Sequence, residues 1–208
     1  MGNNFLELFR KHPFLGIARA LPPEQAVNCA EVCKNTGLMF IEVPLNMSHS
    51  VLALKTLCNE GKKRKLVVGA GTIITESDLR VALDCGAEFI VSPGINEGVV
   101  RACAEKNVPC IPGALTPTEI MQASALGATA IKLFPVSALG GSQYIKELRG
   151  PFKNIPLLAC GGVKPENACD FFKAGCDFVS FGASVFSVSE MENGDWKCIE
   201  QKLLCYSL

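Results

Sequence analysis

The chain has 208 residues, of which 49% are hydrophobic, and its twenty basic side chains are balanced by twenty acidic ones. This length and composition predict a well-packed globular protein with a single domain over residues 1–208. The balanced charge argues against nucleic acid as a partner. No run of about eighteen apolar residues and no signal-peptide pattern occurs, so we expect no membrane partner and a cytoplasmic location.

Eleven cysteines are scattered along the chain, and none of them forms a Cys-x-x-Cys pair. Several lie in or beside apolar runs, where free thiols behave as small core residues. We therefore expect a reduced protein without a disulfide framework. The two histidines, His12 and His49, are isolated from each other in the sequence, so we predict neither a metal site nor a cofactor.

Eight short apolar segments alternate with helical patterns along the chain, which is typical of a parallel sheet. The expected strands are Phe14–Ala18, Met39–Val43, Leu66–Gly69, Phe89–Val91, Pro109–Ile111, Thr129–Leu133, Leu157–Cys160 and Phe178–Phe181. The expected helices are Pro22–Thr36, Ser48–Asn59, one from about Thr75, Glu97–Lys106, Thr116–Leu126, Tyr144–Leu148, Pro165–Lys173 and Trp196–Leu204.

Four segments of the chain resemble one another, and each contains a glycine just before an apolar run. These glycines are Gly37, Gly86, Gly127 and Gly175, and each is expected to end a helix in the left-handed conformation. They recur after roughly every second strand, which is the internal layering of a (β/α)8 barrel. An open doubly wound sheet would not need this period, so the predicted fold class is an α/β TIM barrel.

The repeat brings together four side chains that lie five positions after the glycines: Glu42, Val91, Lys132 and Ser180. In a barrel they share one interior layer near the C-terminal mouth, where barrel enzymes keep their active sites. A desolvated lysine loses its proton more readily, and the neutral amine is a nucleophile for carbonyl carbon. The alternative interpretation is a buried Glu42–Lys132 ion pair with a structural role only.

Glycines also follow the seventh and eighth predicted strands, at Gly161-Gly162 and at Gly182. This is the usual place for phosphate in the fold, because backbone N–H groups without a side chain in the way can approach phosphate oxygens. We expect a short helix to begin after Gly182 and to add its dipole. At the mouths of the first and third strands, Arg19 offers a bidentate fork for an anion and Thr72 offers a hydroxyl.

Five segments together resemble the KDPG/KHG aldolase family in order and spacing. They are Ile41–Asn46, Gly69–Thr72, Ser92–Gly94, Ile131–Pro135 and Gly161–Val163. The family consists of class I pyruvate aldolases that act on 2-keto-3-deoxy-6-phosphogluconate, its galactonate epimer or 2-keto-4-hydroxyglutarate. The resemblance implies a TIM barrel that assembles as a homotrimer and needs no metal or cofactor.

The resemblance also implies roles for particular residues. Lys132 looks like the Schiff-base lysine and Glu42 like the general acid/base. The remaining positions are Arg19 and Thr72 for the substrate carboxylate, Pro93 and Phe134 around the pyruvyl group, and Gly161, Gly162, Gly182 and Ser184 for phosphate. Cys160 stands where members that prefer the gluconate epimer commonly have threonine, and we expect it to affect the choice of epimer because a thiol donates hydrogen bonds poorly.

The implied reaction yields pyruvate and glyceraldehyde 3-phosphate, or pyruvate and glyoxylate from 4-hydroxy-2-oxoglutarate. Two alternatives stay open. One is a sugar-phosphate epimerase or isomerase on the same barrel, which would need further acidic or metal-binding residues at the strand mouths. The other is a catalytically silent barrel that binds a phosphorylated metabolite.

Overall fold

The structure is a computed structural model, and it describes residues 2–206. Its strands are β1 Phe14–Ile17, β2 Phe40–Pro44, β3 Val67–Gly71, β4 Ile90–Val91, β5 Cys110–Ile111, β6 Gly113–Ala114, β7 Ile131–Leu133, β8 Leu157–Cys160 and β9 Phe178–Phe181. Over the described residues they form one sheet in the order β5-β4-β3-β2-β1-β9-β8-β7-β6. Every pairing between neighbours is parallel, as predicted from the alternation of strands and helices.

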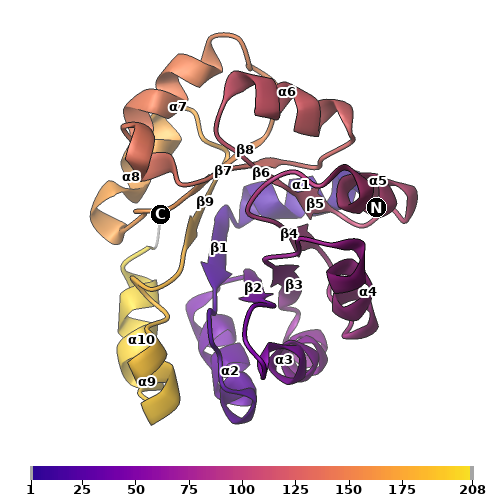
Figure 1. Ribbon diagram of the computed structural model, residues 1–208. Coiled ribbons are helices and arrows are strands. Elements are labelled where there is room, and N and C mark those ends of the chain that lie inside the picture. The colour runs from indigo at the N-terminus through magenta and orange to yellow at the C-terminus, as the bar shows by residue number, and fades with distance from the viewer. Residues whose placement is uncertain (1, 207–208) are drawn as a thin grey trace.

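Helices surround the strands on the outside of the barrel (Figure 1). They are α1 Gly2–Lys11, α2 Ala26–Thr36, α3 Ser50–Arg64, α4 Glu76–Asp84, α5 Glu97–Glu105, α6 Pro117–Ala125, α7 Ser142–Arg149, α8 Pro165–Lys173, α9 Val188–Asn193 and α10 Trp196–Leu204, with 3-10 turns η1 Pro23–Gln25 and η2 Val136–Leu139. Within residues 2–206, no helix combines the length and the apolar character needed to cross a bilayer.

The fifth strand continues beyond its predicted end at Ile111, and Pro112 divides it into β5 and β6, which are the two ends of the strand order. Proline has no N–H to donate, so it interrupts the ladder of hydrogen bonds. Its carbonyl still accepts a hydrogen bond from the backbone N–H of Lys132 at 2.9 Å. Because β5 pairs with β4 and β6 pairs with β7, the sheet curls round into a barrel.

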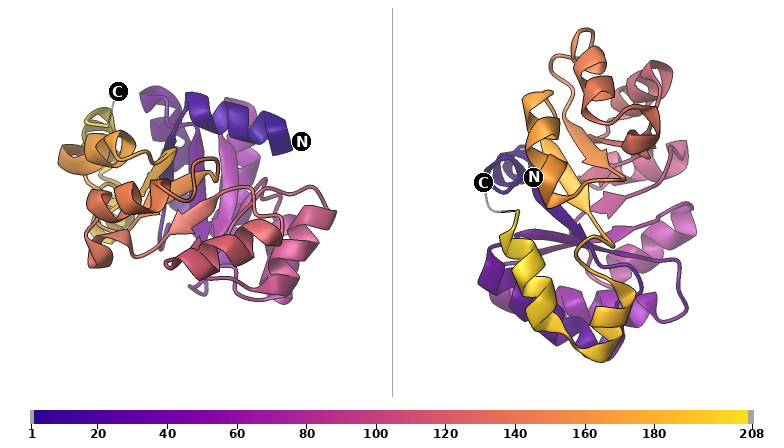
Figure 2. Two further views of the ribbon diagram at one scale, coloured as in Figure 1. Left: turned by 90° about the horizontal axis from the view of Figure 1, so that it is seen from above. Right: turned by 90° about the vertical axis from the view of Figure 1, so that its left-hand side faces the viewer.

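The sequence analysis did not predict α1, which lies across one end of the barrel (Figure 2). Phe5 and Phe9 of this helix pack on three interior rings, those of Phe40, Phe89 and Phe178. The ring of Phe9 stacks on that of Phe178, with 3.9 Å between their centroids. An aromatic cluster therefore fills the barrel interior at its N-terminal end, and the interior can open only at the opposite end.

The predicted layering of the barrel interior is confirmed. Gly37, Gly86, Gly127 and Gly175 all have positive φ, between 78° and 99°. The side chains three positions later, Phe40, Phe89, Ala130 and Phe178, belong to one interior cluster. Since successive strand residues alternate between faces, the side chains two positions further on point to the same interior and form the next layer. These are Glu42, Val91, Lys132 and Ser180, and all four are buried.

Candidate active site

Glu42 is in the middle of β2 and is 1% exposed, although it carries a carboxylate. The neighbouring strand makes room for it at Gly71. A Cβ atom at position 71 would lie 1.2 Å from Oε2 of Glu42, so no residue with a side chain fits there while the carboxylate keeps its place. Oε2 has no hydrogen-bond partner within the described part of the chain. The carboxylate is thus buried with one oxygen that has no hydrogen-bond partner among the described residues.

Burial raises the pKa of the Glu42 carboxyl above its ordinary value of 4.5, because the charged form loses its hydration. The positive charges of Lys132 and, to a smaller extent, Arg19 act in the opposite direction and lower the pKa. Desolvation is the largest of these effects. A carboxyl whose pKa is raised toward neutrality suits a group that both accepts and donates a proton during a reaction.

Lys132 lies at the centre of β7 and is 8% exposed. Its ammonium nitrogen is 5.1 Å from the centroid of the Phe134 ring, which is a cation–π distance. Among the described residues, no carboxylate lies within 4.0 Å of this nitrogen. Glu42 and Lys132 therefore share the interior layer and feel each other's charge, but they do not form the direct structural ion pair that was the alternative interpretation.

A cavity of about 620 Å³ opens above this layer. Among the predicted site residues, ten line it: Arg19, Thr72, Pro93, Lys132, Phe134, Cys160, Gly161, Gly162, Gly182 and Ser184. Glu42 does not line it, because its carboxylate is buried against Gly71. The described lining includes three basic side chains and no acidic one. In a chain with balanced charge, this concentration of positive charge favours an anionic ligand.

Thr72 and Arg19 occupy the strand mouths where they were predicted. Thr72 has a φ of 57°, a left-handed conformation that is unusual for a β-branched residue and costs about 1–3 kcal/mol. The residue after Arg19, Ala20, has a similar φ of 59°. Backbone strain of this kind persists where the surrounding structure holds the residue in place. The side chains of Thr72 and Arg19 both line the cavity.

The other side of the cavity is built on the loops after β8 and β9. Gly161 and Gly162 have φ values of 96° and 77°, which only glycine adopts easily. The expectation of a helix after Gly182 is wrong. Residues 183–186 make a single turn in which the carbonyl of Gly182 accepts two backbone hydrogen bonds, and α9 begins only at Val188. The Ser184 hydroxyl donates to the carbonyl of Val163 at 3.3 Å and joins the two loops.

Two residues beside these glycines were missed in the sequence. Lys164 lines the cavity, and Asn167 binds the backbone of the loop that contains Gly162. The available signal was a basic residue and an asparagine on either side of Pro165, shortly after a glycine pair, which could have indicated two more residues at the cavity. From the sequence alone, this segment predicts only the start of a helix.

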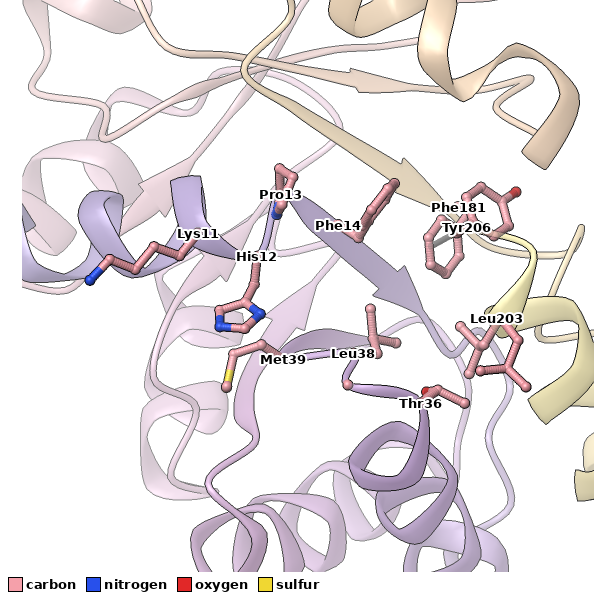
Figure 3. Close-up of a pocket in the computed structure, with 12 residues that line it drawn as sticks. Lys11, His12, Pro13, Phe14, Thr36, Leu38, Met39, Phe181, Leu203 and Tyr206 are labelled. Carbon is pink, nitrogen blue, oxygen red and sulfur yellow. The ribbon is translucent and has the colours of Figure 1, made fainter. Parts of the chain in front are cut away.

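A second cavity, of about 250 Å³, lies where the chain enters β1 and β2 (Figure 3). It is lined mainly by apolar side chains, together with Lys11 and His12, and none of the predicted site residues lines it. In the described residues, no three His, Cys, Asp or Glu side chains are grouped so that they would hold a metal ion.

The fold and the cavity define a class of protein. It is a (β/α)8 barrel with an amine and a carboxyl buried in one interior layer, below a cavity that carries positive charge. These are the elements that a barrel enzyme needs to form a covalent adduct with a carbonyl compound and to move protons around it.

Comparison with known proteins identifies the family. The model of the family described as KDPG and KHG aldolase matches residues 6–202. A probable 2-dehydro-3-deoxy-6-phosphogalactonate aldolase of Rhizobium meliloti (strain 1021) is 33% identical over 186 residues, which are 89% of this chain and 86% of that protein. The KHG/KDPG aldolase of Escherichia coli (strain K12) is 30% identical over 173 residues, which are 83% and 80% of the two chains.

Solved structures agree. The KDPG aldolase of Legionella pneumophila, with pyruvate captured as a covalent carbinolamine intermediate, has a TM-score of 0.89 at 25% identity and covers 98% of both chains. The native KDPGal structure has a TM-score of 0.87 at 28% identity and covers 93% of this chain and 92% of that one. The chain belongs to the KDPG and KHG aldolase family and is a class I aldolase.

Replacing Gly71 by alanine tests the contact between β3 and Glu42. The backbone conformation of Gly71 is open to alanine, but the new Cβ would collide with the carboxylate. We expect aldolase activity to fall by about 10²-fold or more, because the proton-transfer group is displaced, and the free energy of unfolding to fall by about 1–3 kcal/mol. Steady-state kinetics and urea unfolding measure both. Gly150→Ala is the control, since its Cβ would meet only an ordinary contact at 3.5 Å. If Gly71→Ala and Gly150→Ala had the same activity and the same free energy of unfolding, the proposed collision with the Glu42 carboxylate would be contradicted.

The raised pKa of Glu42 predicts a pH-dependent contribution to stability. Between the unfolded value of 4.5 and the higher folded value, the folded chain binds more protons than the unfolded chain. The contribution of Glu42 to stability is therefore complete below 4.5 and is lost as the pH rises through the folded pKa. Glu42→Gln removes the titrating group, so this loss of stability with rising pH does not occur in the variant. In urea unfolding from pH 4 to pH 8, the stability of Glu42→Gln relative to wild type should increase with pH, and a constant or decreasing difference would refute the assignment.

Proposed function

We propose that this aldolase cleaves 2-keto-3-deoxy-6-phosphogluconate, or its galactonate epimer, to pyruvate and glyceraldehyde 3-phosphate. The proposal depends on one observation above all: Lys132 and Glu42 are buried in the same interior layer, below a cavity whose described lining is basic and not acidic. The relatives are named for phosphogluconate and phosphogalactonate substrates. The Escherichia coli relative named KHG/KDPG aldolase supports 4-hydroxy-2-oxoglutarate as a further substrate, cleaved to pyruvate and glyoxylate.

Lys132 is the nucleophile in this proposal. Its neutral amine attacks the C2 ketone, and the carbinolamine loses water to give an iminium ion. A carbinolamine of pyruvate was captured in the Legionella pneumophila relative, and such an adduct requires an amine. The described cavity lining contains two lysines, Lys132 and Lys164, and of these only Lys132 is in the interior layer with a carboxylate.

Glu42 moves the protons. Its carboxylate, directly or through a water molecule, takes the proton of the C4 hydroxyl as the C3–C4 bond breaks. The electron pair of that bond passes to the iminium nitrogen, which leaves an enamine on Lys132 and releases the aldehyde. The carboxyl then protonates C3 of the enamine, and hydrolysis of the resulting iminium frees pyruvate. Burial raises the pKa of the Glu42 carboxyl, which favours its return to the protonated form after it has accepted a proton.

The two sides of the cavity match the two ends of the substrate. Arg19 and Thr72 at the mouths of β1 and β3 would hold the carboxylate, while Pro93 and Phe134 would pack against the pyruvyl carbons. The loops after β8 and β9 would hold the phosphate through the backbone of Gly161, Gly162 and Gly182, with the Ser184 hydroxyl beside them. Cys160, at the end of β8, lines the same cavity as Lys132 and would contact the middle of the substrate, where the epimers differ.

The same proposal includes a homotrimer in the cytoplasm. A chain 28% identical to this one, with a TM-score of 0.88, is part of a porous protein cage designed by fusing symmetric oligomeric domains. That protein supports an oligomer in general, and the family resemblance in sequence favours three subunits.

Pyruvate formation from the three candidate substrates is the direct test. Wild type should release pyruvate from at least one of the phosphorylated substrates. Lys132→Met should lower the rate by a factor of about 10⁴ or more, because the covalent path is lost. The exposed Lys197 provides the control variant Lys197→Met, which should keep wild-type rates. A folded wild-type protein that forms no pyruvate, or an active Lys132→Met variant, would refute the proposed function.

A further inference from the structure

The phosphate side of the cavity is made largely of neutral groups. Gly161, Gly162 and Gly182 offer backbone N–H groups, and Ser184 offers a hydroxyl whose hydrogen is engaged by the carbonyl of Val163. A phosphate ester carries about −1.5 to −2 charges near neutral pH. Desolvating such a dianion against neutral donors alone is costly, so a positive charge close by is expected.

The backbone at the start of α8 does not supply that charge. Pro165 has no N–H, and the N–H of Lys164 donates to Oδ1 of Asn167 at 2.8 Å. The N–H groups of Asn167 and Ala168 both donate to the carbonyl of Lys164, at 3.2 and 3.0 Å. Three of the first amides of this helix are therefore engaged within the helix start itself, and proline removes another. An anion above the loop meets few free donors there.

The side chain of Lys164 remains available. It lines the cavity together with Gly161, Gly162 and Ser184. Among the ion pairs of residues 2–206, none includes Lys164, whereas Lys173 at the other end of α8 lies 3.8 Å from Asp170. The adjacent acidic residue, Glu166, is exposed and does not line the cavity. The ammonium of Lys164 is thus an uncompensated charge on the phosphate side.

Asn167 fixes the backbone that carries the Lys164 side chain. Its side-chain amide donates to the carbonyl of Gly162 at 2.9 Å, while its oxygen accepts the N–H of Lys164 at 2.8 Å. One side chain thus connects the glycine pair to the lysine. On the other side of the loop, a Cβ at position 162 would lie 2.7 Å from Cβ of Ser137, so the loop is confined from both directions.

We propose that Lys164 is the phosphate-recognising cation of this enzyme and that Asn167 is the residue that positions it. This inference rests on the proposed function, because it assigns charge to the phosphate end of the same substrate. The ammonium hydrogen-bonds a phosphate oxygen and takes no part in the covalent steps. Lys164 therefore determines preference for phosphorylated over non-phosphorylated substrates, and it does not affect the chemistry at Lys132.

The test compares Lys164→Met with Lys164→Arg, which keeps the charge, and with Lys173→Met, which removes a lysine of the same helix outside the cavity. For Lys164→Met we expect KM for the phosphorylated substrate to rise about tenfold or more, as for loss of a hydrogen bond to a charged group. The change in kcat should be less than about threefold. Inhibition by glycerol 3-phosphate should weaken by the same factor, and trapping of pyruvate on Lys132 by borohydride should keep its wild-type pyruvate dependence. Lys164→Arg and Lys173→Met should resemble wild type.

Asn167→Ala provides a second variant, because its effect on KM for the phosphorylated substrate should be in the same direction and smaller, again without a change in pyruvate trapping. Unchanged KM and inhibition in Lys164→Met, or an equal loss of pyruvate trapping, would overturn the assignment.

Binding of glycerol 3-phosphate by calorimetry separates this inference from the proposed function, since it needs no turnover. If wild type binds the ester and Lys164→Met loses it, the role of Lys164 stands even where no substrate is cleaved. If wild type does not bind the ester, the inference fails.

Discussion

A carboxylate enclosed in the interior of a barrel is the constraint on which the rest of this structure depends. Glu42 is removed from water, and burial alone would strongly favour its neutral form. The structure tolerates the charge because two cations act on it, and it tolerates the volume because β3 has no side chain at Gly71. At the N-terminal end of the barrel, the aromatic rings that α1 contributes exclude water from the interior. A buried carboxyl of raised pKa results from this enclosure.

In the proposed function, the cavity above Glu42 is divided between two kinds of anion recognition. On the side of β1 and β3, strained backbone places Arg19 and Thr72 at the cavity, a rigid arrangement suited to a flat carboxylate. On the side of β8 and β9, glycines with positive φ let backbone approach a tetrahedral phosphate. Lys132 lies between these sides, next to the Phe134 ring. A ligand with an acid at one end and a phosphate at the other would place its ketone within reach of the amine.

Much of this arrangement follows from the sequence because a barrel repeats itself. The glycines before β2, β4, β7 and β9 set a common register, so counting five residues from each gave Glu42 and Lys132 as members of one layer. Register in a closed parallel sheet is shared between strands, which is why a local pattern predicted that two residues far apart in the sequence share one layer. The glycine loops were predictable for a similar reason, since their place after the last two strands is a property of the fold.

Other features depend on contacts that no local pattern records. The role of α1 is visible only when the rings of Phe40, Phe89 and Phe178 are seen to meet at one end of the barrel. The absence of a helix after Gly182 and the bonds of Asn167 are decided by how two loops pack together. In each case tertiary packing, and not the propensity of the segment, determined the outcome.

Borohydride reduction in the presence of pyruvate, followed by intact mass and peptide mapping, tests the chemistry of Lys132 most directly. The reduced adduct should add one pyruvyl group to the chain and map to the peptide that contains Lys132, and Lys132→Met should give no adduct. A folded wild-type protein without an adduct, or an adduct on another lysine, would contradict the role of Lys132 as the Schiff-base nucleophile.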